Sequence, residues 1–340
     1  MDKRIILAVA GSGKTRHIID SLDLNRRSLI VTYTNNNYYN IKSRIIQKFG
    51  YLPDNICLFS YFSFLYSFCF KPFLLTKTGV KGIRFDPCAN KFAKGDKRYI
   101  DSNSRVYSNR LTKLIIEKGE AESVSARISK YFDDVLFDEI QDFAGNDFNF
   151  LPYVVNTDCN VLFVGDFYQH TFDTSRDGNT NANLHKQLDG YLDKAKTMGL
   201  AVDADTLDSS YRCSPSVCKF VEANLGIAIG SKREDETEIL TLDDETDIRD
   251  AFNDNDIVKL FYQSRSKYPC FGRNWGESKG EDRYNDVCVV LNKSTYKQYS
   301  ENKLVELNPI TRNKLYVAIT RTKGRLIFVS EQRVKSILKL

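Results

Sequence analysis

The fold of this chain is constrained most by one glycine-rich segment, Ala8-Val9-Ala10-Gly11-Ser12-Gly13-Lys14-Thr15. It follows an apolar run at residues 5–9 that predicts a buried strand, and it opens a helical pattern that extends to Leu22. Gly11 and Gly13 permit a tight backbone path, and the N–H groups at a helix N-terminus favour an anion. The order of strand, glycine-rich turn and helix therefore predicts a phosphate-binding loop.

The residue types in this loop also predict how a nucleotide is bound. Lys14 is expected to reach the β- and γ-phosphates, and the hydroxyl of Thr15 is expected to bind Mg²⁺. The usual pattern begins with glycine, whereas this chain has Ala8 at that position. The alternative is a glycine-rich turn in an unrelated fold, and the position of the segment directly after an apolar strand argues against it.

Short apolar runs recur along the chain, with helical patterns between many of them. They are predicted to be buried parallel strands at residues 5–9, 28–32, 135–137, 161–164, 287–291 and 326–329. This alternation predicts an α/β fold with a doubly wound sheet.

A group of carboxylates follows the predicted strand at residues 135–137. Parallel α/β sheets bind their ligands at the carboxyl ends of the strands. Asp138 is therefore expected to complete the Mg²⁺ ligands together with Thr15, and Glu139 to orient and deprotonate the attacking water. An acidic turn of this kind can equally be a solvated strand end, and its pairing with the phosphate-binding loop favours the catalytic interpretation.

Two segments differ in charge from the rest of the chain. Residues 71–113 carry eleven Lys and Arg against three Asp and Glu, a net charge of +8, with five aromatic residues interspersed. They are predicted to form a small inserted subdomain that adds electrostatic affinity for nucleic acid, with a solvated basic surface as the alternative. Residues 231–256 carry eleven acids against three bases and are predicted to be a partly solvated connection between two cores.

The overall composition is compatible with these interpretations. The 340 residues suffice for two modest domains, and the net charge of +5 is compatible with a polyanionic partner. No apolar run approaches the length of a membrane span, so no membrane contact is expected. The eight cysteines include no CxxC pair, which indicates reduced thiols in a cytoplasmic protein rather than a zinc site.

Several further motifs resemble those of superfamily 1 helicases of the UvrD/Rep type. The AxAGxGKT form of the loop and the DExQD form of residues 138–142 are typical of that family. Six other segments resemble its motifs in the same order: VTYTN at 31–35 (TxTN), SYFSF at 60–64 (TFHSF), VGDFYQ at 164–169 (VGDxxQ), LDSSYR at 207–212 (LxxNYR), ESKGE at 277–281 (KGxE) and YVAITR at 316–321 (YVAxTR). Together the motifs span residues 8–321, nearly the full chain.

The resemblance implies roles for residues of these motifs. Gln169 would sense the γ-phosphate, and Arg212 and Arg321 would act as arginine fingers that stabilise charge in the transition state. The residues implied around the rest of the nucleotide are Gln141, Tyr211 and Glu281, the last on the ribose. The alternative for each arginine is a surface or interface salt bridge.

The resemblance also implies the architecture and the nucleic-acid track. The fold would contain two RecA-like P-loop cores with parallel sheets, the first at residues 1–205 with a small basic insertion at about 70–130, and the second at 206–340. ATP and Mg²⁺ would be bound between the cores. The residues implied in contacts with single-stranded DNA are Thr32, Thr34 and Asn35 for the backbone, Phe64 for base stacking, and Phe172 in place of a family tyrosine.

The chain also departs from the family pattern. The large second-core insertion is missing, only seven residues precede the loop, and Thr174 stands where the family has a stacking tryptophan. Two functions are therefore expected from the sequence. The first is an ATP-dependent translocase or helicase on single-stranded DNA, for which the resemblance implies 3′→5′ polarity. RNA is an alternative track, and a protein partner could supply the missing insertions. The second is an ATPase switch in a larger complex, regulated by DNA or by a partner, with little unwinding of its own.

Overall fold

The computed structural model describes residues 1–88, 90, 92–171 and 179–339. The chain forms two compact units. The first contains residues 1–6 and 14–165 and the segment that ends at Asp203, and the second contains residues 7–13 and 166–171 and the segment that begins at Ala204. Within the described residues, no helix is both long and apolar enough to cross a membrane.

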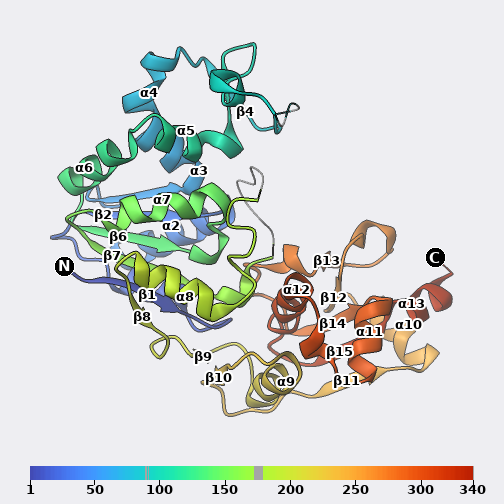
Figure 1. Ribbon diagram of the computed structural model, residues 1–340. Coiled ribbons are helices and arrows are strands. Elements are labelled where there is room, and N and C mark those ends of the chain that lie inside the picture. The colour runs from blue at the N-terminus through green and yellow to red at the C-terminus, as the bar shows by residue number, and fades with distance from the viewer. Residues whose placement is uncertain (89, 91, 172–178, 340) are drawn as a thin grey trace. The chain divides into compact units, whose positions relative to one another are not determined.

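The first unit is built around a six-stranded sheet in the order β3-β2-β6-β7-β1-β8 (Figure 1). Its strands are β1 (Lys3–Leu7), β2 (Ser28–Thr32), β3 (Ile56–Ser60), β6 (Asp134–Asp138), β7 (Asn160–Gly165) and β8 (Ala201–Asp203). Strand β2 is buried along its whole length, as expected for an apolar run in the interior of a parallel sheet. Because β2 pairs in parallel with β3 and β6, and β6 pairs in parallel with β7, the carboxyl ends of these strands lie at one edge.

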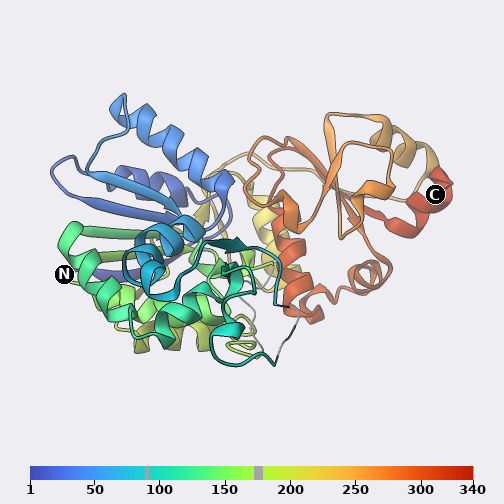
Figure 2. The same ribbon diagram turned by 90° about the horizontal axis from the view of Figure 1, so that it is seen from above.

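Helices cover both faces of this sheet (Figures 1 and 2). On one face α1 packs against α2, and on the other α6 packs against α7. The helices of this unit are α1 (Lys14–Asp20), α2 (Asn35–Phe49), α3 (Tyr61–Ser63), α4 (Lys71–Thr78), α5 (Leu111–Glu117), α6 (Ala121–Tyr131), α7 (Gly145–Val155) and α8 (Leu188–Thr197). A π-helical turn at Phe64–Phe70 joins α3 to α4.

The basic segment 71–113 contains α4 and a two-stranded sheet of β4 (Gly82–Arg84) and β5 (Arg105–Tyr107). Part of its positive charge is neutralised by nearby carboxylates. Asp101 pairs with Arg84 at 3.4 Å and with Arg105 at 2.8 Å, and Lys77 pairs with Glu120 at 2.6 Å. Because Asp101 is already counted in the net charge of +8, it is the pair with Glu120, outside the segment, that lowers the charge offered to a polyanion.

The second unit contains a five-stranded sheet in the order β11-β15-β14-β12-β13, and all of its strand pairs are parallel. Its strands are β11 (Ile239–Leu242), β12 (Ile257–Phe261), β13 (Gly272–Asn274), β14 (Asp286–Leu291) and β15 (Leu326–Ser330), and a short separate pair is formed by β9 (Ser209–Ser210) and β10 (Gly230–Ser231). The helices are α9 (Pro215–Leu225), α10 (Glu245–Asn253), α11 (Lys293–Ser300), α12 (Pro309–Ile319) and α13 (Glu331–Leu338).

Alternate residues of β12, β14 and β15 enter two hydrophobic clusters on opposite faces of this sheet. On β14, Val287 and Val289 join the cluster that includes residues of α9 and α12, whereas Cys288 and Val290 join the cluster that includes residues of α10 and α13. A sheet buried on both faces explains why the strand reads as a continuous apolar run. The predicted fold class, two RecA-like α/β cores with parallel sheets, is confirmed.

The acidic segment 231–256 is not a connection between two cores, and that prediction is wrong. It supplies β11, which pairs with β15, and α10, which covers one face of the second sheet. Ile248, Ala251 and Phe252 are buried on one side of α10, while the carboxylates of the helix face solvent. The acidic residues are thus the solvated side of an amphipathic element of the core.

We expect Phe252→Ala to lower the free energy of unfolding of the second unit by about 3–5 kcal/mol, because it removes a buried ring that packs near Phe261. Asp247→Ala, on the exposed side of the same helix, is the matched control and should change stability by about 0.5 kcal/mol or less. Urea unfolding followed by circular dichroism measures both changes. Equal, small effects would show that the segment is a solvated connection after all.

Candidate functional site

The glycine-rich loop requires glycine at two positions where the backbone is left-handed. Gly11 has a φ of 73° and Gly13 a φ of 88°, and α1 begins directly after them at Lys14. A Cβ on Gly11 would also lie 2.6 Å from the Oγ atom of Ser210 and 2.7 Å from the Cβ atom of Arg212. Glycine at this position is therefore needed both by the backbone conformation and by the close approach of residues 207–212.

Hydrogen bonds hold the rest of the loop. The N–H of Val9 donates to the carbonyl of Leu207 at 3.0 Å, and the N–H of Tyr211 donates to the carbonyl of Gly11 at 2.9 Å. The hydroxyl of Ser12 donates to the carbonyl of Val9 at 2.9 Å. The backbone of residues 8–13 is thus fixed by the segment that follows it some 200 residues later in the sequence.

Glu139, directly after β6, has a backbone conformation that is unusual for a residue other than glycine. Glu139 has a φ of 55°, in the left-handed region, and it is nearly buried. Its carboxylate accepts a hydrogen bond from the amide of Gln141 and another, at 3.4 Å, from Asn37 Nδ2 on α2. Backbone strain of this kind is concentrated at functional sites. Gln141, which was expected beside the nucleotide, clamps Glu139 in this structure.

The residues of the first unit fit a magnesium–nucleotide complex. Thr15 and Asp138 offer the hydroxyl and carboxylate oxygens that Mg²⁺ prefers, and α1, which carries Thr15, packs against β6, which ends at Asp138. Lys14 is partly exposed at the start of α1.

Gln169 and the adjoining Asp166 form a buried pair in the second unit. The side-chain amide of Gln169 donates to Asp166 Oδ2 at 2.9 Å, and Asp166 Oδ1 caps the short helix at Phe167–Gln169 by accepting from the N–H of Tyr168 at 3.1 Å. The side chain predicted to sense the γ-phosphate is therefore held by a carboxylate of its own motif.

The two arginines predicted to act as fingers both lie near one carboxylate of the second unit, Asp282. Arg212 forms a hydrogen-bonded ion pair with it, and Arg321 approaches it to 4.0 Å. Arg212 also donates to the carbonyl of Thr320 at 3.0 Å. The predicted ribose ligand Glu281 instead pairs with Arg283 at 3.3 Å, and Tyr211 is exposed.

Sequence reasoning missed Asp282, although the motif contained a signal for it. The pattern KGxE has one residue between glycine and glutamate, so that Lys279-Gly280-Glu281-Asp282 places Asp282 at the acidic position. The carboxylate beside the arginines is therefore the one that the spacing selects. Glu281 contributes its backbone carbonyl, which accepts from Arg321 at 3.2 Å.

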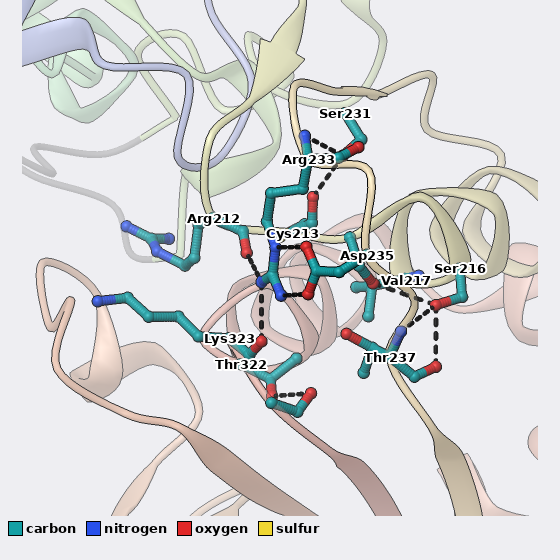
Figure 3. Close-up of polar contacts among 12 residues, drawn as sticks. Arg212, Cys213, Ser216, Val217, Ser231, Arg233, Asp235, Thr237, Thr322 and Lys323 are labelled. Atoms are coloured by element: carbon teal, nitrogen blue, oxygen red, sulfur yellow. Dashed lines mark hydrogen bonds and ion pairs between the residues drawn. The ribbon is translucent and has the colours of Figure 1, made fainter.

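A third arginine, Arg233, joins the two segments that carry the predicted fingers. Figure 3 shows its guanidinium between the carbonyls of Arg212 and Lys323, to which it donates at 2.5 Å and 2.7 Å, while Asp235 neutralises its charge. Hydrogen bonds of Ser231 to Cys213 and to Arg233 brace the same region. Arg233 lies in the acidic segment, where no local pattern distinguished it.

The structure separates the residues predicted to contact nucleic acid. Thr32 and Phe64 are fully buried, and Phe64 packs against Phe59, Phe68 and Phe137, so neither side chain is available to a bound strand. The predicted stacking role of Phe64 is therefore contradicted. Thr34 caps α2 by accepting from the N–H of Asn37 at 3.2 Å, and Asn35 is exposed. Phe172 lies outside the described residues.

Other aromatic side chains of the first unit surround an open cavity of about 280 Å³. Its lining residues are Tyr33, Tyr61, Phe62, Leu65, Phe85, Ser108, Asn109 and Asp147. Phe62 and Phe85 lie with ring centroids 5.3 Å apart, and Phe85 is 70% exposed. The cavity brings the two motif segments near residues 33 and 61 together with the basic insertion.

Comparison with known proteins shows that the fold of this chain also occurs in a solved structure. No family model and no curated protein matches the sequence. The arterivirus nonstructural protein 10 (helicase) in complex with DNA has a similar structure, with a TM-score of 0.50 at 12% identity over 99% of this chain and 63% of that chain. A second structure of the arterivirus protein has a TM-score of 0.48 at 14% identity, over 99% of this chain and 62% of that chain. This chain therefore shares the fold of that protein, and it spans less than two thirds of the length of the helicase chain that it resembles.

We expect Phe64→Ala to lower the free energy of unfolding of the first unit by about 3–5 kcal/mol, because it leaves a cavity among packed aromatic rings. Phe62→Ala, two residues away at the partly exposed cavity, should cost about 1 kcal/mol or less. Chemical denaturation of the two variants measures the difference. A Phe64 variant as stable as the Phe62 variant would contradict the buried position of this ring.

Proposed function

We propose that this chain is a Mg²⁺-dependent ATPase that uses hydrolysis to move along single-stranded DNA. One observation carries the proposal: a glycine-rich loop with two left-handed glycines precedes a helix that packs against β6, and β6 ends in Asp138 and the strained Glu139. Phosphoryl transfer depends on positioning and charge neutralisation, and these are the residue types that supply both.

In the proposed reaction each side chain of the first unit has one task. Lys14 binds the β- and γ-phosphates, and Thr15 and Asp138 bind Mg²⁺, which neutralises phosphate charge when it is bound. Glu139 positions the attacking water and accepts its proton, with its carboxylate oriented by Gln141 and Asn37. Two amide donors keep that carboxylate in one orientation without neutralising its charge.

The second unit is proposed to supply Gln169 as the γ-phosphate sensor and Arg212 and Arg321 as the groups that stabilise the transition state. In this assignment Asp282 holds Arg212, and the carbonyls of Val317 and Glu281 hold Arg321, until phosphate oxygens compete for the two guanidinium groups. The proposal retains the UvrD/Rep-like assignment of the motifs and the 3′→5′ polarity that this assignment implies, with Tyr211 and Glu281 near the nucleotide.

Single-stranded DNA is proposed to bind the first unit along Thr34, Asn35 and the aromatic cavity. The similar arterivirus helicase was solved with DNA, and exposed aromatic faces suit the stacking of unpaired bases. The second candidate function is a nucleotide-gated ATPase switch, which the engagement of both arginines by Asp282 favours. Many-fold stimulation of hydrolysis by single-stranded DNA supports the motor, whereas no stimulation by DNA or RNA supports the switch.

We expect Lys14→Ala to abolish both ATP binding and hydrolysis, and Glu139→Gln to lower turnover by roughly 100-fold or more while ATP binding persists. The physical reason is that Lys14 contacts phosphate in the ground state, whereas Glu139 acts on the water. Phosphate release and the binding of a fluorescent nucleotide measure the two effects. Glu122→Gln, at an exposed position of α6, is the matched control. Normal hydrolysis by Glu139→Gln would remove Glu139 from its assigned role.

We expect Phe85→Ala to weaken binding of a single-stranded oligonucleotide by roughly tenfold, because it removes one aromatic face of the cavity. Phe92→Ala removes an even more exposed ring of the same segment that does not line the cavity, and should leave affinity unchanged. Fluorescence anisotropy with labelled oligo-dT and oligo-rU at several salt concentrations measures both. Equal affinities of the two variants would reject the cavity as a base-binding site.

A further inference from the structure

A buried tyrosine connects the glycine-rich loop to Gln169. The N–H of Ala10 donates to the hydroxyl oxygen of Tyr316 at 2.9 Å, and that hydroxyl donates to Asp166 Oδ2 at 3.0 Å. The same carboxylate oxygen accepts from the side-chain amide of Gln169 at 2.9 Å. One hydroxyl therefore links the loop backbone to the group that holds the predicted γ-phosphate sensor.

Burial and packing around Tyr316 restrict its hydroxyl to these hydrogen-bond partners. The side chain is completely buried on α12, and its ring packs edge-on to Tyr168 with centroids 6.1 Å apart. Burial and the Asp166 carboxylate raise the pKa of Tyr316 well above its usual value, so the hydroxyl stays protonated and donates to the carboxylate. A second contact from α12, in which Asn313 donates to the carbonyl of His170 at 3.0 Å, fixes the helix against residues 166–171.

The hydrogen bond between Ala10 and Tyr316 restricts the backbone of the glycine-rich loop. Because Tyr316 occupies the N–H of Ala10, this amide is not available to a phosphate, and its role is to fix the backbone just before Gly11. A shift of the loop on nucleotide binding would move the hydroxyl, and Asp166 with Gln169 would have to follow or lose a buried hydrogen bond. The reverse also holds, since a shift of Gln169 changes the support of the loop.

We infer that Tyr316 is a positioning residue that couples the glycine-rich loop to Gln169, so that occupancy of the loop and the orientation of the γ-phosphate sensor change together. This inference rests on the proposed ATPase function and adds to it a residue that contacts neither nucleotide nor metal. Tyr316 acts through Asp166 and through the amide of Ala10.

The test is a double-mutant cycle of Tyr316→Phe and Gln169→Ala, with ATP turnover measured in single-turnover experiments and expressed per ADP-binding site. Tyr316→Phe keeps the ring and removes only the hydroxyl. It should lower turnover roughly tenfold, the effect of one lost buried hydrogen bond. In the Gln169→Ala background the same change should lower turnover by less than about twofold, because the group that it positions is gone.

A merely structural role would give a different pattern. Loss of stability lowers the number of ADP-binding sites and leaves turnover per site unchanged, so a normal rate per site in Tyr316→Phe overturns the inference. An equal reduction in both backgrounds also overturns it, because the hydroxyl would then act independently of Gln169. If Tyr316→Phe does not fold, Asp166→Asn weakens the same link from its other end and takes its place in the cycle.

Tyr284→Phe is the matched control. Tyr284 is buried in the same unit, and its hydroxyl has no hydrogen-bond partner among the described residues, so its removal should leave turnover unchanged. The activity of the wild-type protein distinguishes failure of the proposed function from failure of the coupling. If it does not hydrolyse ATP, the proposed function fails, whereas a hydrolysing wild type with an unaffected Tyr316→Phe variant rejects only the coupling.

Discussion

Carboxylates buried at the ends of strands determine how both regions of the candidate site are built. Asp138, Glu139 and Asp166 each follow or end a strand and are almost completely removed from water. A buried carboxylate is costly unless hydrogen-bond donors replace its solvent. Some of those donors are neighbouring residues, and two come from other segments of the same unit: the amide of Asn37 for Glu139 and the hydroxyl of Tyr316 for Asp166. Satisfying the charge therefore also ties these segments together. The hydrogen bonds that replace water around these carboxylates therefore also preorganise the candidate site.

The strands that sequence reasoning found are those whose burial on both faces leaves a continuous apolar run. Residues 28–32 were predicted with the observed bounds, and 287–291 differ from β14 by a single residue. Strand β12 was missed because Lys259 interrupts its apolar run. This lysine is fully buried, and its ammonium group donates to the carbonyl of Asp254, which precedes the strand. Burial lowers the pKa of Lys259, a tertiary effect that no local pattern reveals.

The error at residues 231–256 came from weighing composition above periodicity. Eleven acids in a short segment suggested solvation, yet Ile248, Ala251 and Phe252 recur at the three- and four-residue spacing of a helix with one buried face. Phe64 is the opposite case, since its place in a motif suggested exposure, whereas the π-helical turn at Phe64–Phe70 directs it into the core. In both cases the face of the element on which a side chain lies, rather than its residue type, determines whether it is buried or exposed.

Sequence motifs located the chemical groups of the candidate site but not the groups that hold them. The loop, Asp138 and Glu139 are recognisable because their chemistry depends on a local order of residues. Their supports are remote: Tyr316 lies 306 residues from Ala10, and Arg233 reaches carbonyls on either side of it in the sequence. By its contacts the loop at residues 7–13 belongs to the second unit, although the helix that it precedes belongs to the first. The backbone of the glycine-rich loop is hydrogen-bonded to Tyr316 and to residues 207–212, so we expect the loop to change its conformation only together with these segments.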